Sequence, residues 1–169
     1  MSLIFITGGA RSGKSRFAIA QAQKLKSPIT FLATAQAFDL EMTERIERHK
    51  LERVALGWHL REEPMQIQKV LLETEGVVLL DCLSLWVSNM LLAEKSEQIM
   101  LEQLNVLLEI QKTRDQTLIL VSNEVGSGVV PEYPLGRTYR DCLGRANQMA
   151  AHAATEAYLI VAGLPLKLK

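Results

Sequence analysis

The residues with the clearest chemical meaning lie near the start of the chain, where a glycine-rich run ends in lysine and serine. The pattern GxxxxGK[ST] is matched by Gly8-Gly9-Ala10-Arg11-Ser12-Gly13-Lys14-Ser15. In a turn between a strand and a helix, such a run directs backbone N–H groups at phosphate oxygens, and the helix dipole adds positive potential. Lys14 can then reach the β- and γ-phosphates, and the Ser15 hydroxyl can bind Mg²⁺. The run predicts a nucleoside triphosphate site, with an ordinary glycine-rich turn as the weaker alternative.

An acidic residue at the end of a later apolar run is the second candidate. Residues 77–80 are Val-Val-Leu-Leu, and Asp81 follows them. In proteins with a phosphate loop, an acid in this position holds Mg²⁺ directly or through water. Many strands end in aspartate, so the pattern gains meaning only beside the loop at residues 8–15. We therefore predict that Lys14 and Asp81 are catalytic and that Ser15 and Asp81 bind the metal.

A basic segment with a histidine is the third candidate. Arg45, His49 and Arg53 are four residues apart, which places them on one stripe of a helix. Guanidinium groups bind phosphate oxygens well, and a neutral imidazole can act as a base, a donor or a nucleophile. A solvated, charged helix face on which His49 has no role explains the same spacing at least as well. The spacing alone leaves both interpretations open.

A loop rich in glycine and proline follows the apolar run at residues 117–122. Asn123 and Glu124 open this loop, at the edge of an open α/β sheet where ligands bind. They can contact the substrate or position a water molecule, and a long structural turn is the alternative. Three basic residues further on can bind phosphate, or can pair with acids such as Asp141 at a subunit contact: Arg137, Arg140 and Arg145.

The elements that must position these residues alternate regularly along the chain. Apolar runs predict strands at residues 3–7, 29–34, 77–80, 117–122 and 158–162, with a short edge strand after residue 163. Helical segments are expected at 14–26, 39–53, 64–73 and 137–156, and in a long region after residue 82 that breaks near 94–96. Because the apolar runs are continuous, we expect strands covered on both faces in a parallel sheet. The prediction is a three-layer α/β fold in one domain, residues 1–169.

Composition narrows the class of protein. The 169 residues are 48% hydrophobic and 22% charged, and 19 basic residues balance 19 acidic ones. A protein that depends on non-specific attraction to nucleic acid or anionic lipid normally has a basic excess. No apolar run is long enough to span a membrane. Cys82 and Cys142 form no CxxC pair and predict buried, reduced thiols. We expect a cytoplasmic protein that binds neither nucleic acid nor membrane.

Taken together, the motifs resemble the bifunctional adenosylcobinamide kinase/adenosylcobinamide-phosphate guanylyltransferase family. The resemblance covers essentially the whole chain. It rests on GGARSGKS at 8–15, RIERHK at 45–50, DCLSLWVSN at 81–89, SNEVGSGVVP at 122–131, GRANQ at 144–148 and AGLP at 162–165. It implies a P-loop, RecA-like three-layer sandwich with a mostly parallel sheet. It also implies a homo-oligomer, with a trimer as the expected form.

The resemblance implies two successive reactions. Adenosylcobinamide is first phosphorylated by a nucleoside triphosphate. GMP is then transferred from GTP to the adenosylcobinamide phosphate through a guanylylated histidine, here His49, which gives adenosylcobinamide-GDP. ATP and GTP are the implied substrates and Mg²⁺ the cofactor. The implied nucleotide-binding residues are the loop at 8–15 with Ala33, Thr34, Ala35, Lys50, Leu51, Glu52, Arg53, Glu62 and Asp81.

The sequence departs from the family pattern between Val54 and Leu60, where the approach to Trp58 is one residue longer. This departure bears on the nucleotide contacts beside His49. Two other functions remain as alternatives. A P-loop kinase of a small metabolite would use His49 only to bind phosphate and would make no guanylyl product. A RecA-like nucleotide switch would hydrolyse nucleotide without an acceptor substrate.

Overall fold

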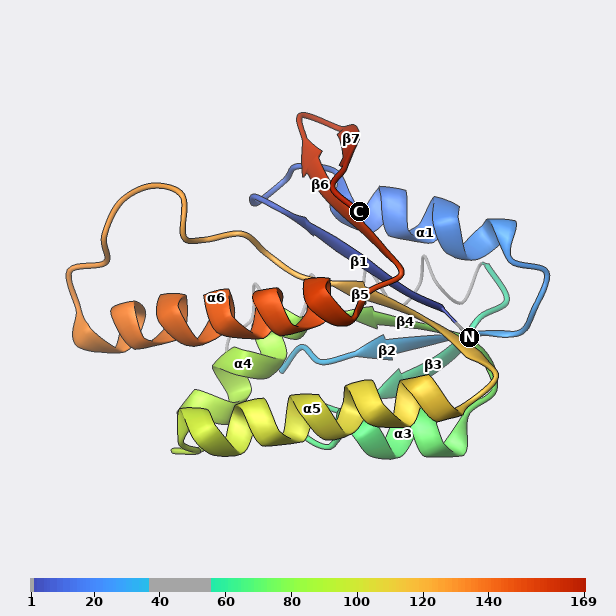
Figure 1. Cartoon of the computed structure of the whole chain (residues 1–169), viewed down its shortest axis with the longest axis horizontal. Helices are drawn as coiled ribbons and strands as arrows, with labels where there is room; N and C mark the ends of the chain where they lie inside the picture. Colours follow the sequence, from blue (N-terminus) through green and yellow to red (C-terminus); the bar gives the residue numbers. More distant parts are fainter. Residues whose placement is uncertain (1, 37–55) are drawn as a thin grey trace.

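The computed structural model describes residues 2–36 and 56–169, which form one twisted sheet with helices on both sides (Figure 1). The strands are β1 (Ser2–Gly8), β2 (Ile29–Ala33), β3 (His59–Glu62), β4 (Gly76–Asp81), β5 (Gln116–Val121), β6 (Glu156–Val161) and β7 (Leu164–Lys167). In the described residues the sheet has seven strands in the order β3-β2-β4-β5-β1-β6-β7. Every neighbouring pair is parallel except β6 and β7, which run antiparallel. The predicted, mostly parallel sheet is confirmed.

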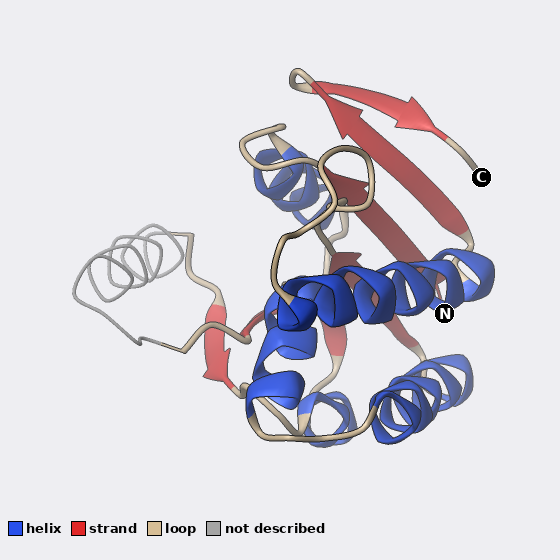
Figure 2. Ribbon diagram, turned by 90° about the vertical axis from the view of Figure 1, so that its left-hand side faces the viewer, coloured by secondary structure: helices blue, strands red, loops and turns tan. Residues whose placement is uncertain are grey.

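The helices divide between the two faces of the sheet. They are α1 (Lys14–Lys24), α3 (Ile67–Glu73), α4 (Leu83–Leu92), α5 (Glu97–Thr113) and α6 (Pro134–Ala153). Alternate residues of a strand point to opposite faces, so Leu3 and Phe5 pack in the core below α3, α4, α5 and α6. Ile4 and Ile6 pack in the second core, against α1. Figure 2 shows the sheet between these helices, which is the predicted three-layer sandwich.

Local sequence explains where several helices begin and end. The predicted break near residue 94 separates α4 from α5, and the Ser96 side chain accepts a hydrogen bond from the Ile99 N–H at 3.3 Å. Pro134 lies in the first turn of α6, where its missing N–H costs no helical hydrogen bond. Across residues 2–36 and 56–169, every helix is too short or too polar to span a membrane.

Two expectations are wrong, one about the end of the last long helix and one about how the edge strands are covered. The last long helix ends at Ala153 rather than at residue 156, because Glu156 already begins β6. Coverage on both faces holds for the central strands but not for the edges of the sheet. β3 is a largely exposed strand, and Leu164 of β7 is 72% exposed. The reason is that α1 packs mainly against β1, β4 and β5, which leaves the edge strands outside its reach.

Candidate active site

The carboxyl ends of the parallel strands bring most of the predicted residues to one edge of the sheet. In the strand register, Asp81 of β4 lies beside Ala33 of β2 on one side and Val121 of β5 on the other. Glu62 of β3 lies beside Ala33, at the outer end of this row. β5 separates β4 from β1, whose last residue is Gly8. The phosphate loop and Asp81 therefore lie at the same edge with one strand between them, and strands are about 4.8 Å apart.

The phosphate loop is held closed by its own backbone and by the turn after β6. The Ser12 N–H donates to the Gly9 carbonyl at 3.2 Å, and the Gly163 N–H donates to the Ser12 carbonyl at 2.8 Å. Lys14 Nζ donates to the Gly9 carbonyl at 3.0 Å. The loop leads directly into α1. The strand–loop–helix context that the motif requires is confirmed.

Two of the loop glycines are required by the geometry. A Cβ on Gly8 would lie 2.6 Å from the Ile160 carbonyl oxygen and 2.7 Å from Ser12 Oγ. Gly13 has φ +96°, a backbone conformation that L side chains rarely adopt, and a Cβ there would lie 3.2 Å from Gly163 Cα. The loop can take this shape only with glycine at both positions.

The open end of α1 and one buried hydroxyl suit a bound phosphate. Gly13 caps α1 without a side-chain hydrogen bond, and the first turn contains no acidic residue. The first helical N–H groups therefore keep their capacity to bind an anion. Ser12 Oγ is buried and has no hydrogen-bond partner among the described residues. A buried polar atom of this kind is costly unless a ligand or water supplies its partner.

Asp81 is followed by a residue whose backbone is fixed on both sides. The Asp81–Cys82 peptide bond is cis. Thr34 Oγ1 donates to the Cys82 carbonyl at 2.8 Å and accepts from the Cys82 N–H at 2.9 Å. Burial first, and the charge of Asp81 second, raise the pKa of the Cys82 thiol to about 11. The thiol is therefore protonated near neutral pH, and the carboxylate beside it is the group able to bind a metal ion.

Ser15 and Asp81 fit Mg²⁺ as a site shared with the nucleotide. The described residues contain no group of three or more His, Cys, Asp or Glu side chains that would form a complete metal cage. Mg²⁺ is commonly bound by one or two protein oxygens together with water and substrate phosphates. A hydroxyl at the start of α1 and a carboxylate at the end of β4 supply such a partial set.

Polar side chains on α4 and α6 support the edge of the sheet, and sequence reasoning missed them as site residues. Asn89 donates through Nδ2 to the Thr34 carbonyl at 2.8 Å and to the Pro64 carbonyl at 3.0 Å. It thereby holds together the chain that leaves β2 and the chain that follows β3. The available signal was an amide within α4, a mostly apolar and largely buried helix.

A second group of polar side chains fixes the start of the late loop. Asn123 Nδ2 donates to Ser84 Oγ at 2.8 Å, and Asn147 Nδ2 donates to the Asn123 carbonyl at 3.0 Å. Ser122 Oγ donates to Asn147 Oδ1 at 2.6 Å. These contacts join β5, α4 and α6. Asn123 therefore has a structural role, and the sequence had left this point open.

The three downstream arginines each contact other groups of the protein. Arg137 donates to the carbonyls of Pro131 and Glu132, at 3.0 and 2.6 Å. Arg140 pairs with Asp141 of the same chain at 3.0 Å. Arg145 pairs with Glu97 across α5 and α6. Each guanidinium therefore has a partner within the protein, and phosphate binding by these arginines stays a prediction.

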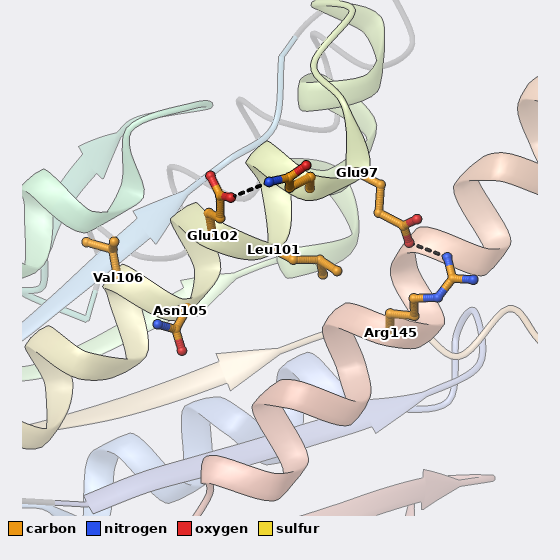
Figure 3. Close-up of a pocket in the computed structure, with 7 residues that line it drawn as sticks. Glu97, Leu101, Glu102, Asn105, Val106 and Arg145 are labelled. Atoms are coloured by element: carbon orange, nitrogen blue, oxygen red, sulfur yellow. Dashed lines mark hydrogen bonds and ion pairs between the residues drawn. The ribbon is translucent and has the colours of Figure 1, made fainter.

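The Arg145–Glu97 pair lines an open pocket between α5 and α6 (Figure 3). Leu101, Asn105 and Val106 also line it, and among the described residues none of those predicted to bind nucleotide or metal does. The nucleotide-site residues belong instead to the strand edge.

Several predicted residues fall outside the described part of the chain. His49, Lys50, Leu51, Glu52 and Arg53 belong to residues 37–55, so their predicted roles stay predictions. Ala33, Thr34, Ala35 and Glu62 lie within the described part. Thr34 is buried, whereas Glu62 is exposed at the end of β3, and the Glu63 N–H donates to the Ala33 carbonyl at 3.0 Å.

The fold has counterparts among solved structures. The RadB recombinase matches 94% of this chain and 73% of its own, with a TM-score of 0.55 and 13% identity. An ATPase from a bacterial type III secretion system matches 98% of this chain and 56% of its own, with a TM-score of 0.59 and 12% identity. At such low identity these matches concern the fold alone. They confirm the predicted RecA-like, P-loop α/β architecture.

Comparisons of sequence extend along the whole chain. A family model described as "Cobinamide kinase / cobinamide phosphate guanyltransferase" matches residues 4–168. The "Bifunctional adenosylcobalamin biosynthesis protein CobP" of Pseudomonas aeruginosa is 41% identical over 97% of this chain and 95% of its own. The corresponding CobU proteins of Escherichia coli and Salmonella typhimurium are 36% and 35% identical, each over 99% of both chains. The chain therefore belongs to the cobinamide kinase / cobinamide phosphate guanyltransferase family.

Proposed function

We propose that this protein phosphorylates adenosylcobinamide with a nucleoside triphosphate and then transfers GMP from GTP to the adenosylcobinamide phosphate. The observation that carries the proposal is a family match over residues 4–168 in a chain whose phosphate loop is closed beside Asp81. A nucleotide switch or a kinase without a guanylyl step has the same loop. Relatives with bifunctional names over 95–99% of their length favour the two-step function.

In the first step, the phosphate loop binds and neutralises the triphosphate. The N–H groups of residues 9–15 surround the β-phosphate, and Lys14 exchanges its contact with the Gly9 carbonyl for phosphate oxygens. Ser15 and Asp81 hold Mg²⁺, which supplies positive charge to the phosphate oxygens when it is bound. These groups position the γ-phosphate for in-line attack by the acceptor hydroxyl, so most of the rate comes from orientation and charge.

In the second step, the imidazole of His49 is the nucleophile. A neutral histidine nitrogen attacks the α-phosphorus of GTP, a phosphorus–nitrogen bond forms and pyrophosphate leaves. An oxygen of adenosylcobinamide phosphate then attacks the same phosphorus, and the histidine is released. Arg45, Arg48 and Arg53 offset negative charge on the α-phosphate and on pyrophosphate. The support for this assignment is the RIERHK motif at residues 45–50 and the family it resembles.

The nucleotide contacts extend outward from the phosphate loop. Ala33 ends β2, Thr34 and Ala35 follow it, and Glu62 ends β3, on the side of Asp81 away from the loop. With residues 50–53 they contact the guanine nucleotide. The register that places Ala33 between Asp81 and Glu62 supports this arrangement.

We further propose a single domain over residues 1–169 that acts in the cytoplasm as a homo-oligomer, with a trimer as the expected form. Support comes from apolar side chains that the single chain leaves exposed. On β6 and β7 they are Val161, Leu164 and Leu166, and in the late loop Val129 and Val130. Exposed apolar side chains that gather into a patch commonly mark an interface. Light scattering after gel filtration measures the mass, and a monomer at micromolar concentration contradicts this part of the proposal.

The two activities are tested by following the corrinoid. Purified protein is incubated with adenosylcobinamide, ATP and Mg²⁺, and GTP is added later, with products identified by mass spectrometry. Adenosylcobinamide phosphate is expected first and adenosylcobinamide-GDP only after GTP is present. Accumulation of the phosphate with no GDP product supports the small-metabolite kinase. Nucleotide hydrolysis with unchanged corrinoid supports the nucleotide switch.

A further inference from the structure

Glu124 lies beside the phosphate loop, between the end of β1, which leads to Lys14, and the end of β4, which carries Asp81. It follows β5, and β5 separates β1 from β4 in the sheet. The Glu124 N–H donates to the carbonyl of Gly8, the first residue of the phosphate loop, at 3.0 Å. Glu124 is thus fixed next to the loop, on the side that faces Asp81.

The carboxylate of Glu124 is oriented by only one of its oxygens. The Gly126 N–H donates to Glu124 Oε1 at 2.7 Å, which folds the side chain over its own loop. Within residues 2–36 and 56–169, Glu124 forms no ion pair, and Oε2 makes no hydrogen bond. Glu124 Oε2 is therefore an oriented carboxylate oxygen that can accept a proton from a group bound at this edge of the sheet.

The backbone that carries Glu124 is held more firmly than a simple surface loop requires. Asn123, the residue before it, donates a hydrogen bond to Ser84 Oγ of α4 at 2.8 Å. Its carbonyl accepts one from Asn147 Nδ2 of α6 at 3.0 Å. Ser122 is fully buried, and its N–H donates to the Ile6 carbonyl of β1 at 2.9 Å. Catalytic side chains need such support, because small displacements reduce the rate strongly.

We propose that Glu124 is the general base of the phosphoryl transfer, an assignment that rests on the proposed function. As the acceptor hydroxyl oxygen forms its bond to the γ-phosphorus, the hydroxyl proton passes to Glu124 Oε2. The bond from the γ-phosphorus to the bridging oxygen breaks, and the nucleoside diphosphate leaves with that electron pair. Asp81 is the less suitable base, because its carboxylate is the group assigned to Mg²⁺.

The Glu124→Gln variant isolates this role. The glutamine amide oxygen can still accept from the Gly126 N–H, so the loop keeps its contact, but the amide cannot take a proton. A general base typically contributes about 10²–10⁴-fold to a rate. We therefore expect phosphorylation of adenosylcobinamide to slow at least about 100-fold. Nucleotide affinity, measured by calorimetry, is expected to stay within about threefold, because the phosphate contacts are unchanged.

Guanylyl transfer supplies the internal comparison. When adenosylcobinamide phosphate is provided directly, Glu124→Gln is expected to form adenosylcobinamide-GDP at close to the wild-type rate, because the phosphate acceptor has no proton to lose. The matched control is Glu132→Gln, which removes an exposed acid of the same loop and is expected to leave both steps unchanged. A melting curve of each variant shows whether the fold is retained.

Three results overturn the assignment. If the Glu124→Gln variant phosphorylates adenosylcobinamide at the wild-type rate, the hydroxyl proton needs no base or passes to another group. Equal losses in both steps, or loss of nucleotide affinity, mean that Glu124 contributes to binding rather than to proton transfer. If the wild-type protein itself leaves adenosylcobinamide unphosphorylated, the proposed function fails, and the base assignment fails with it. If the wild type and the Glu124→Gln variant both phosphorylate adenosylcobinamide at the same rate, the proposed function stands and only the assignment of Glu124 as the base fails.

Discussion

Thr34 and Cys82 exchange two hydrogen bonds across the ends of β2 and β4. The Thr34 hydroxyl donates to the Cys82 carbonyl at 2.8 Å and accepts from the Cys82 N–H at 2.9 Å. Both residues are buried, and Cys82 directly follows Asp81. The side chain of Thr34, directly after β2, therefore fixes the backbone next to the proposed metal-binding carboxylate.

This contact predicts a larger loss of stability for Thr34→Val than for Thr34→Ser. Thr34→Val keeps the shape but leaves the buried Cys82 N–H unpaired, which costs about 1–3 kcal/mol, while the Cys82 carbonyl keeps its hydrogen bond from the Trp86 N–H. Thr34→Ser keeps the hydroxyl and is expected to lose less than about 1.5 kcal/mol through the missing methyl. Urea unfolding of both variants measures the difference. Equal stability of the two would show that the paired hydrogen bonds contribute nothing.

The phosphate loop predicts a contrast between its first two glycines. The Cβ of Gly8→Ala would meet the Ile160 carbonyl and Ser12 Oγ at 2.6 and 2.7 Å, so the loop must shift. We expect a loss of about 1–3 kcal/mol in stability, together with loss of nucleotide binding. A Cβ on Gly9 meets no atom within 4 Å, and Gly9→Ala is the control for stability. Similar melting temperatures for the two variants would contradict the described loop geometry.

Asp81→Asn is expected to weaken Mg²⁺-dependent turnover much more than folding. An amide at this position keeps the size of the side chain but removes the charge that attracts the cation. The Mg²⁺ concentration for half-maximal phosphorylation is expected to rise at least about tenfold, while melting temperature changes little. The Mg²⁺ titration is compared with that of Asp115→Asn, at the opposite end of the sheet. A large drop in melting temperature, with normal turnover by the fraction that remains folded, would show that Asp81 has a structural role instead.

The Cys82 thiol predicts a loss of stability at alkaline pH. Its pKa is raised to about 11, by burial and then by the charge of Asp81, whereas an unfolded thiol titrates near about 8.5. The folded chain therefore keeps this proton where the unfolded chain has lost it. The corresponding stabilisation is complete below the unfolded pKa and declines as pH rises toward 11, by at most about 1.4 kcal/mol per pH unit.

Urea unfolding between about pH 8 and 10 measures this decline. In Cys82→Ser the slope with pH is expected to be smaller, because serine does not titrate there. Cys142→Ser serves as the control for the other buried thiol. An unchanged slope in Cys82→Ser would show that this thiol is not responsible.

Local motifs predicted the part of the site that local chemistry determines. The loop at residues 8–15 carries its own signal, and the apolar runs identified the central strands. Their carboxyl ends then had to meet at one edge, which placed Asp81 near Lys14. β3 was harder to identify, because the sequence His-Leu-Arg-Glu contains no apolar run and pairs only through its neighbour β2.

Contacts between distant residues explain what the sequence did not predict. An alanine-rich segment favours a helix past Ala153, yet Thr155 exchanges hydrogen bonds with the backbone of Leu3 on β1, at 3.2 and 2.8 Å. This tertiary contact ends the helix. The supporting roles of Ser84, Asn89 and Asn147 likewise depend on partners 24 to 55 residues away, which no local pattern specifies.

Transfer of label from α-labelled GTP to the protein tests the two-step function most directly. The wild-type protein, incubated with labelled GTP and Mg²⁺ and then denatured, is expected to carry label in a bond that is labile in acid and resists alkali, as phosphoramidates do. The His49→Ala variant is expected to carry no label and to convert adenosylcobinamide only as far as its phosphate. His59 is an exposed residue of β3, and the His59→Ala variant is expected to be labelled like the wild type. Label on His49→Ala, or formation of adenosylcobinamide-GDP by a wild-type protein that never acquires label, would contradict transfer through His49.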